Sequence, residues 1–89
     1  MNEQEFRTQL AQQGYGDPKT GAYDVGPPSD EHSHDFSVTG MVLDGTFVLT
    51  TAKGAQTLTA GETWILAAGT PRQEQAVGDG PARLLYRTK

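Results

Sequence analysis

The sequence has no cysteine among its 89 residues. Disulfides, thiolate metal sites, iron–sulfur clusters and a cysteine nucleophile are therefore excluded, and with them a secreted miniprotein stapled by disulfides. Long apolar runs are missing too, because no segment approaches the roughly 18 apolar residues of a membrane-spanning helix. The opening segment, Met1 to Gln13, is polar where a signal peptide would be apolar. We therefore expect a cytoplasmic protein with no membrane partner.

Positive charge is scarce. Seven Lys and Arg residues stand against eleven Asp and Glu residues, which gives a net charge of −4. This balance repels the phosphate backbone of nucleic acids, so we expect no nucleic-acid partner. A chain of this length buries only about 60% of the surface that its unfolded form exposes. We therefore expect one small domain whose stability is supplemented by a homodimer.

Turn-forming residues, in contrast, are abundant, with 11 Gly and 5 Pro. From Thr20 onward they recur at short intervals and separate segments rich in β-branched and aromatic residues, which is typical of strands. No helical pattern separates these segments, and this favours an antiparallel all-β sandwich or barrel. The strands are predicted over Val38 to Leu43, Thr46 to Thr51, Ala55 to Leu58, Thr63 to Ala67 and Ala82 to Arg87.

The N-terminal segment has a different pattern. Phe6 and Leu10 lie four positions apart between Asn2 and Gln13, and Gly14 follows, which predicts a short amphipathic α-helix. We therefore expect a single domain with a helix over residues 1–14 and a β-barrel over residues 20–89.

The two histidines of the chain, His32 and His34, are separated by Ser33. On a strand, residues i and i+2 project from the same face, so the two imidazoles could converge on one ion. Neutral imidazole is a common ligand of zinc, nickel, copper and iron. The pair therefore has two interpretations, a metal site or two partly exposed histidines without a ligand.

Glycines surround this pair in a regular spacing. Five residues separate Gly26 from His32, Gly45 ends the stretch, and a second stretch runs from Gly61 to Arg72 through Gly69-Thr70-Pro71. The two stretches resemble the first and second signatures of the cupin superfamily. The resemblance implies a small single-domain cupin with an antiparallel jelly-roll barrel. Because that fold supports dioxygenases, isomerases, decarboxylases and non-enzymatic binders, it leaves open whether the chain is an enzyme.

The resemblance also implies four metal ligands: the two histidines, a Glu after them and a His in the second signature. Val38 stands at the Glu position and Arg72 at the His position, so a site with all four ligands cannot form. His32, His34 and Glu74 are then the candidate ligands for one divalent transition metal (Fe, Mn, Ni, Cu or Zn). The alternative for Glu74 is a simple ion pair with Arg72, two residues before it.

Without a metal, two further interpretations remain. Arg72 could face a pocket walled by Phe36, Val38 and the histidines, where its planar guanidinium would bind the carboxylate or phosphate of an anionic small molecule. The chain could instead act through its surface as a protein-interaction module, with Trp64 at an interface. We predict binding of a divalent metal, a small molecule or both in the pocket, with the metal-free anion-binding or interaction module as the alternative.

Overall fold

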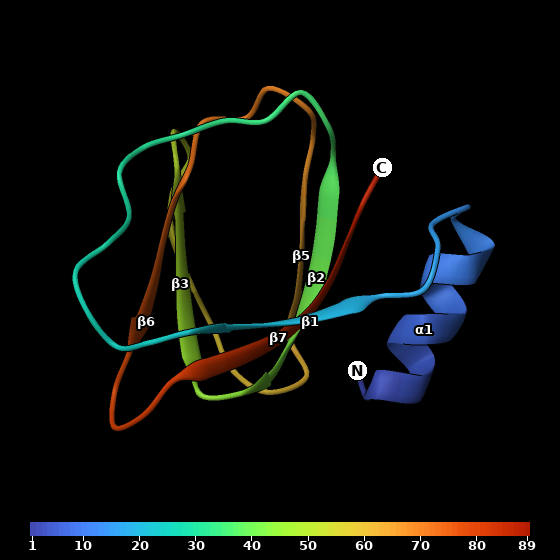
Figure 1. Cartoon of the computed structure of the whole chain (residues 1–89), viewed down its shortest axis with the longest axis horizontal. Coiled ribbons are helices and arrows are strands. Elements are labelled where there is room, and N and C mark those ends of the chain that lie inside the picture. The colour runs from blue at the N-terminus through green and yellow to red at the C-terminus, as the bar shows by residue number, and fades with distance from the viewer.

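The computed structural model describes residues 1–89 as one short helix and seven strands, which form two antiparallel sheets that face each other (Figure 1). One sheet has the strand order β1-β7-β2-β5 and the other the order β4-β3-β6. The elements are α1 (Glu3–Gln12), β1 (Lys19–Tyr23), β2 (Val38–Asp44), β3 (Thr46–Thr51), β4 (Gly54–Leu58), β5 (Thr63–Leu66), β6 (Gln73–Val77) and β7 (Ala82–Thr88).

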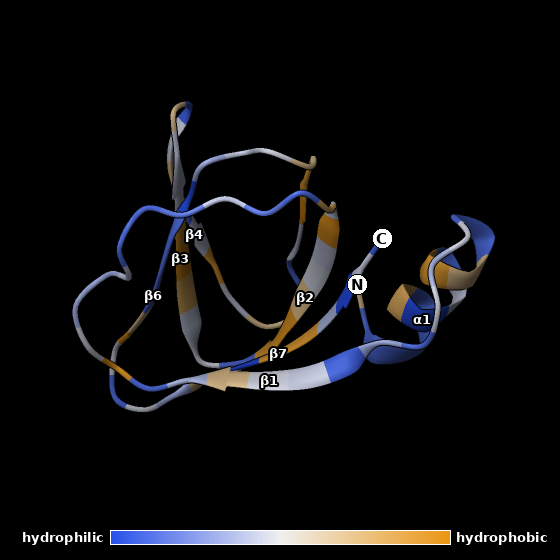
Figure 2. Ribbon diagram, turned by 45° about the horizontal axis from the view of Figure 1, so that its top comes forward, coloured by the Kyte–Doolittle hydropathy of each residue, from blue (hydrophilic) through white to orange (hydrophobic).

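The main apolar core lies between the two sheets. In β3, Phe47 and Leu49 alternate with more exposed neighbours and face the other sheet, where Val42 of β2 and Leu84 of β7 meet them. Apolar stretches of β2, β3 and β7 therefore appear as orange bands in the hydropathy view (Figure 2). Such alternation is what a strand with one covered face requires.

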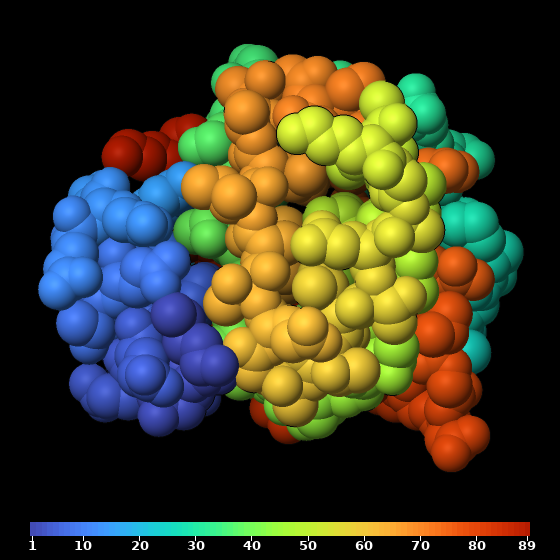
Figure 3. Space-filling model, turned by 180° about the vertical axis from the view of Figure 1, so that it is seen from behind, coloured from blue at the N-terminus to red at the C-terminus, as the bar shows by residue number.

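Helix α1 covers the outer face of the four-stranded sheet and stays outside the space between the sheets (Figure 1). Phe6 and Leu10 are buried there against Met41 of β2 and Leu85 of β7, which form a second apolar cluster. Asn2 begins the helix with a capping box in which its side chain and that of Glu5 each accept a backbone N–H. The back view shows the helix as a blue lobe beside the body that the strands form (Figure 3). This packing explains why β2 is apolar on both faces.

The sheets do not close into a continuous hydrogen-bonded barrel. Strand β5 pairs only with β2, and β4 pairs only with β3, so these two edges are not joined. The edge of β6 is covered instead by the segment between β1 and β2, through single bridges from Val25 to Ala76 and from His32 to Arg72. The predicted antiparallel β architecture with one short helix is confirmed, whereas a closed barrel is not seen because the pairing between sheets is limited to these bridges.

The helix and the five strands predicted from the sequence are all present; the strand ends differ from the predicted ones by at most one residue, and the helix is two residues shorter at each end than the predicted 1–14. Strands β1 and β6 were not delimited by the sequence pattern. Residues Gln73 to Val77 are mostly polar, and Lys19 to Tyr23 show no clear apolar alternation. Only pairing with β7 and β3 makes strands of them. The chain has no helix of the length and apolar character that crossing a membrane requires.

Gly45 is the tightest point of the link between the sheets, and it provides a test of the fold. Its φ is +83°, and an added Cβ would lie 2.5 Å from the carbonyl oxygen of Pro81. Gly78 has a φ of +98° but open space around it, so it is the matched control. Gly45→Ala should lower the free energy of unfolding by at least about 1 kcal/mol more than Gly78→Ala, because both alanines are strained but only one is also overpacked. Urea denaturation measures the difference, and equal losses would contradict this packing.

Candidate functional site

A cavity of about 340 Å³ lies between the two sheets. Its walls come from β1, β2, β5, β6 and β7 and from the segment that precedes β2. Most of the lining is apolar or aromatic, and the polar side chains gather where β6 begins. A volume in this range is typical of sites for small molecules, which start at about 300 Å³. Phe36, Val38 and Arg72, all predicted to line a pocket, do so.

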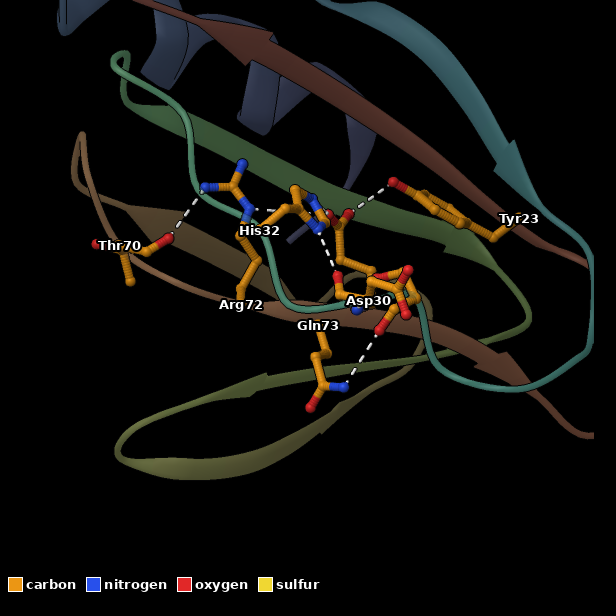
Figure 4. A network of polar contacts seen from close by, with 8 residues as sticks. Tyr23, Asp30, His32, Thr70, Arg72 and Gln73 are labelled. Carbon is orange, nitrogen blue, oxygen red and sulfur yellow. Dashed lines mark hydrogen bonds and ion pairs between the residues drawn. The ribbon is translucent and has the colours of Figure 1, made fainter.

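Glu74 on β6 is the centre of the polar cluster. Tyr23 of β1 donates its hydroxyl to Oε2 at 2.6 Å, and His32 places Nε2 2.9 Å from Oε1. The guanidinium Nε of Arg72 lies 3.7 Å from the same Oε1. Figure 4 shows the side chains of Tyr23, His32 and Arg72 pointing toward one another from β1, the segment before β2 and the start of β6. With only 14% of its side chain exposed, Glu74 depends on these partners to offset its lost hydration.

Backbone hydrogen bonds hold the segment before β2 against β6. His32 and Arg72 exchange both of their backbone bonds, at 3.0 and 2.9 Å. Ser29 donates its N–H to the carbonyl of Glu74 and accepts the N–H of Glu74 on its hydroxyl, each at 2.9 Å. The histidine pair therefore lies on an irregular segment with one isolated bridge, and not on the regular strand considered for it. The backbone of this segment therefore supplies hydrogen-bond partners along the edge of β6, which lets a strand with polar side chains form there.

The two histidine side chains have different surroundings. His34 stacks on Phe36 with ring centroids 4.7 Å apart and an interplanar angle of 11°, and it lines the cavity. The ring of His32 meets that of His34 edge-on at 5.3 Å, but His32 belongs to the Glu74 cluster and does not line the cavity. The structure thus brings His32 and Glu74 together, as the predicted set of metal ligands requires, whereas His34 lies against Phe36.

Both ring nitrogens of His32 face oxygen atoms. Nδ1 lies 2.9 Å from the carbonyl oxygen of Asp30, and Nε2 lies 2.9 Å from Oε1 of Glu74. His32 therefore joins the backbone of its own segment to the carboxylate on β6. The permanently charged guanidinium of Arg72 lies near the same carboxylate oxygen.

Arg72 is the least satisfied group of the cluster. It is only 4% exposed, yet Nη1 makes a single long hydrogen bond, 3.3 Å, to the carbonyl of Thr70. Its Nε is buried without any hydrogen-bond partner. A buried N–H that lacks a partner costs roughly 1 to 3 kcal/mol, and more for a charged group. Because Arg72 also lines the cavity, an acceptor placed there would offset this cost.

Tyr23 was not among the predicted site residues. Burial raises the pKa of its hydroxyl above the ordinary value of 10.0, and the hydrogen bond to Glu74 and the charge of that carboxylate raise it further. Tyr23 therefore keeps its proton and remains a donor to Glu74. No motif marks it, since only the pairing of β1 with β7 brings it to the cavity. Trp64 and Tyr86 likewise line the cavity, although Trp64 was considered for an interface.

The comparison with known protein families identifies the scaffold. A family model described as the cupin domain matches residues 21–86. The chain belongs to the cupin family. Its match covers both glycine-rich stretches, so the resemblance predicted from them is confirmed. No curated protein matches the sequence of this cupin.

Solved structures with the same fold are similar at low sequence identity. A cupin protein from Bacteroides fragilis is 20% identical with a TM-score of 0.66, over 89% of this chain and 70% of that one. A Cupin 2 conserved barrel domain protein from Salinispora arenicola is 18% identical with a TM-score of 0.69, over 80% and 60% of the two chains. An oxalate oxidase in complex with the substrate analogue glycolate is 19% identical with a TM-score of 0.67, over 78% of this chain and 39% of that one. These likenesses establish the fold.

Cupins often bind a transition metal, but the side chains of this cupin do not fit one. The structure contains no group of three or more His, Asp or Glu side chains placed to hold an ion. Val38 and Arg72, only 8% and 4% exposed, occupy the interior at the two substituted ligand positions. Both oxygens of Glu74 are already engaged, and a guanidinium stands beside them. The three predicted ligands, His32, His34 and Glu74, do not converge on one point in this structure, and the metal site stays a prediction.

The raised pKa of Tyr23 leads to a test of the cluster. Tyr23→Phe should lower the free energy of unfolding by about 1 kcal/mol near neutral pH, because one hydrogen bond to a carboxylate is lost. In the wild type this stabilisation is fully present below pH 10.0, where the unfolded tyrosine also keeps its proton, and is lost as the pH rises beyond it. The gap between wild type and variant should thus narrow above pH 10. Urea denaturation measured across that pH range gives this difference in the free energy of unfolding. A difference that stays constant would contradict the hydrogen bond between Tyr23 and Glu74.

Proposed function

We propose that this cupin binds a small organic anion in the cavity between its sheets and that Arg72 is the residue that holds it. The observation that carries the proposal is the buried guanidinium, whose Nε has no partner although the side chain lines the cavity. A carboxylate or phosphate presents two oxygens in the geometry that the guanidinium fork recognises. The family assignment and the two facing sheets support a jelly-roll barrel as the scaffold of this site.

The charge of the site favours an anion over a cation. Arg72 places a permanent positive charge in the cavity wall, which repels a cation and attracts an anion. Apolar side chains form part of the cavity wall beside Arg72, and an ion pair partly buried there is screened less than one at the surface. A structural neighbour supports a carboxylate in particular, because the oxalate oxidase of the same fold was solved with glycolate.

The remaining side chains have supporting roles in this proposal. Glu74, held by Tyr23 and His32, keeps the guanidinium in place from one side without saturating it. Phe36 and Val38 form an apolar part of the cavity wall, which excludes water from the ion pair between Arg72 and the bound anion. The proposal is one of binding, and it requires no residue to act as a nucleophile.

Arg72→Lys is the direct test, because a lysine keeps the charge but not the planar fork. With glycolate, acetate and benzoate as probes, calorimetry should give at least about tenfold weaker binding for the variant, since a lost charge-assisted hydrogen bond is worth about 1.5 to 3 kcal/mol. Arg83→Lys is the matched control, because Arg83 is 54% exposed and pairs with Asp44 at 2.8 Å on the surface. Equal affinities of Arg72→Lys and wild type would contradict the proposal, and thermal melting checks that both variants fold.

The competing metal proposal has its own measurement. Protein purified without a chelator or a polyhistidine tag should contain far less than one equivalent of Fe, Mn, Ni, Cu or Zn by elemental analysis. The double variant Val38→Glu, Arg72→His restores the two substituted ligand types and should raise the metal content. A wild-type content near one equivalent, lost in His32→Ala, would favour His32, His34 and Glu74 as ligands over the anion site.

Two predictions on the setting of the protein stay predictions, namely the cytoplasmic location and the homodimer. Sedimentation equilibrium tests the dimer. If it forms, Ile65 is a residue to substitute first, because this side chain is 66% exposed on β5, whose outer edge is unpaired. Ile65→Gln should then weaken self-association without changing anion binding.

A further inference from the structure

Aromatic side chains are concentrated around the cavity. Four of the seven aromatic residues of the chain line it: Tyr23, Phe36, Trp64 and Tyr86. They belong to β1, β5 and β7 and to the segment before β2, so they surround the space and do not form a stripe on one strand. Trp64 belongs to the main apolar core, and Tyr23 and Tyr86 pack against that core, so these rings form part of the core and of the cavity wall together.

Two of these rings, those of Trp64 and Tyr86, each lie over a glycine. Gly40 of β2 is paired with Trp64 on β5 and with Tyr86 on β7, so all three residues lie in one row of the sheet. Residues paired in register project from the same face of a sheet. An added Cβ at Gly40 would lie 2.2 Å from the indole of Trp64, and one at Gly21 would lie 3.1 Å from the ring of Tyr86. The absent side chains leave room for the rings to lie close to the backbone and keep the cavity open.

Contacts with other rings hold the aromatic walls in place. Trp64 and Tyr23 both pack on Phe47, with centroids 5.2 and 5.3 Å apart, and Phe47 is completely buried. Phe36 is stacked on His34. Rings that are already ordered lose little conformational entropy when a flat ligand binds between them. The cavity therefore suits a rigid planar group.

The charges of the lining limit the ligand to one anionic group. Arg72 is the one Lys or Arg side chain in the cavity wall, and Glu74 is its one carboxylate. A second anionic group on the ligand would be buried in an apolar cavity without a counter-charge, which is costly. The volume of about 340 Å³ lies at the lower end of the range for small-molecule sites and favours one ring over a fused system.

We infer that the ligand is a single-ring aromatic monocarboxylate, with its carboxylate on Arg72 and its ring between Trp64, Tyr86 and Phe36. The inference rests on the proposed function, because the carboxylate anchor is the same. It adds that the preference for a planar π system comes from the glycine-backed rings. Offset or edge-to-face contacts between aromatic rings add stabilisation beyond the area that they bury.

Calorimetry with four probes separates these contributions. Benzoate should bind at least about threefold tighter than cyclohexanecarboxylate, which has the same number of carbons but no π system. Acetate should bind at least about tenfold more weakly than benzoate because it leaves the aromatic walls uncovered. Phthalate should bind no better than benzoate, since its second carboxylate finds no partner. Trp64 is the one tryptophan of the chain, so its fluorescence should change with benzoate and report occupancy directly.

Variants of the aromatic wall complete the test. Trp64→Leu should remove the preference for benzoate over cyclohexanecarboxylate while acetate binding is retained. Gly40→Ala should weaken benzoate at least tenfold, because the new Cβ displaces the indole toward the cavity. Tyr15→Leu is the control, since Tyr15 is aromatic but lies outside the cavity wall, and it should leave the preference unchanged. Melting curves identify a variant that has not folded. If Gly40→Ala does not fold, the result with Trp64→Leu decides the test.

The outcomes distinguish this inference from the proposed function. Equal affinities for benzoate and cyclohexanecarboxylate, both lowered by Arg72→Lys, would overturn the aromatic preference and leave the anion site standing. If none of the carboxylates binds, or if their binding does not depend on Arg72, the proposed function fails and the inference fails with it. Tight binding of phthalate relative to benzoate would overturn the restriction to one carboxylate.

Discussion

The carboxylate of Glu74, half-buried at the wall of the cavity, is the group on which the organisation of this cavity depends. Its oxygens are contacted by Tyr23 from β1, by His32 from the segment before β2 and by Arg72 at the start of β6. A buried carboxylate without such partners would be strongly destabilising. The need to satisfy it therefore fixes three separate segments to one point, and that point holds the segment before β2 along the edge of β6. The polar end of the cavity follows from this arrangement.

The same arrangement changes what the cupin scaffold can bind. At a position where the family resemblance implies a metal-binding histidine, Arg72 places a permanent positive charge in the cavity wall. At the implied Glu position, Val38 adds an apolar side chain to the same wall. Both substitutions favour an anion over a metal ion. The guanidinium of Arg72 would repel a metal ion, whereas an anion is stabilised by a cation with an apolar side chain beside it. The positive charge of the site is carried by the Arg72 side chain and not by a metal ion, and the planar guanidinium has a geometry suited to a carboxylate.

Much of the strand pattern could be predicted because turn glycines and β-branched runs are local signals. Gly45 and Gly61 mark turns that require a positive φ, and the strands beside them were located to within one residue. Strands β1 and β6 carry no such signal, because β6 has polar residues that are satisfied by tertiary partners. Of the site, Arg72 could be named from its place at the end of the second glycine-rich stretch, and Glu74 from its position two residues later. Tyr23 could not, because it lies about fifty residues from Glu74 in sequence and meets it only through the sheet.

The sequence by itself determined the family, the all-β class with one N-terminal helix, and the loss of two of the implied metal ligands. These features depend on residue types and spacings that act locally, as glycines in turns and alternating apolar residues do. The tertiary structure decided which side chains face one another. It showed that His32 turns to Glu74 while His34 turns to Phe36, that Arg72 is buried with an unpartnered Nε, and that aromatic rings surround the cavity. The physical reason is that these contacts join strands distant in the chain, and their geometry is set by sheet pairing and by the burial of charge.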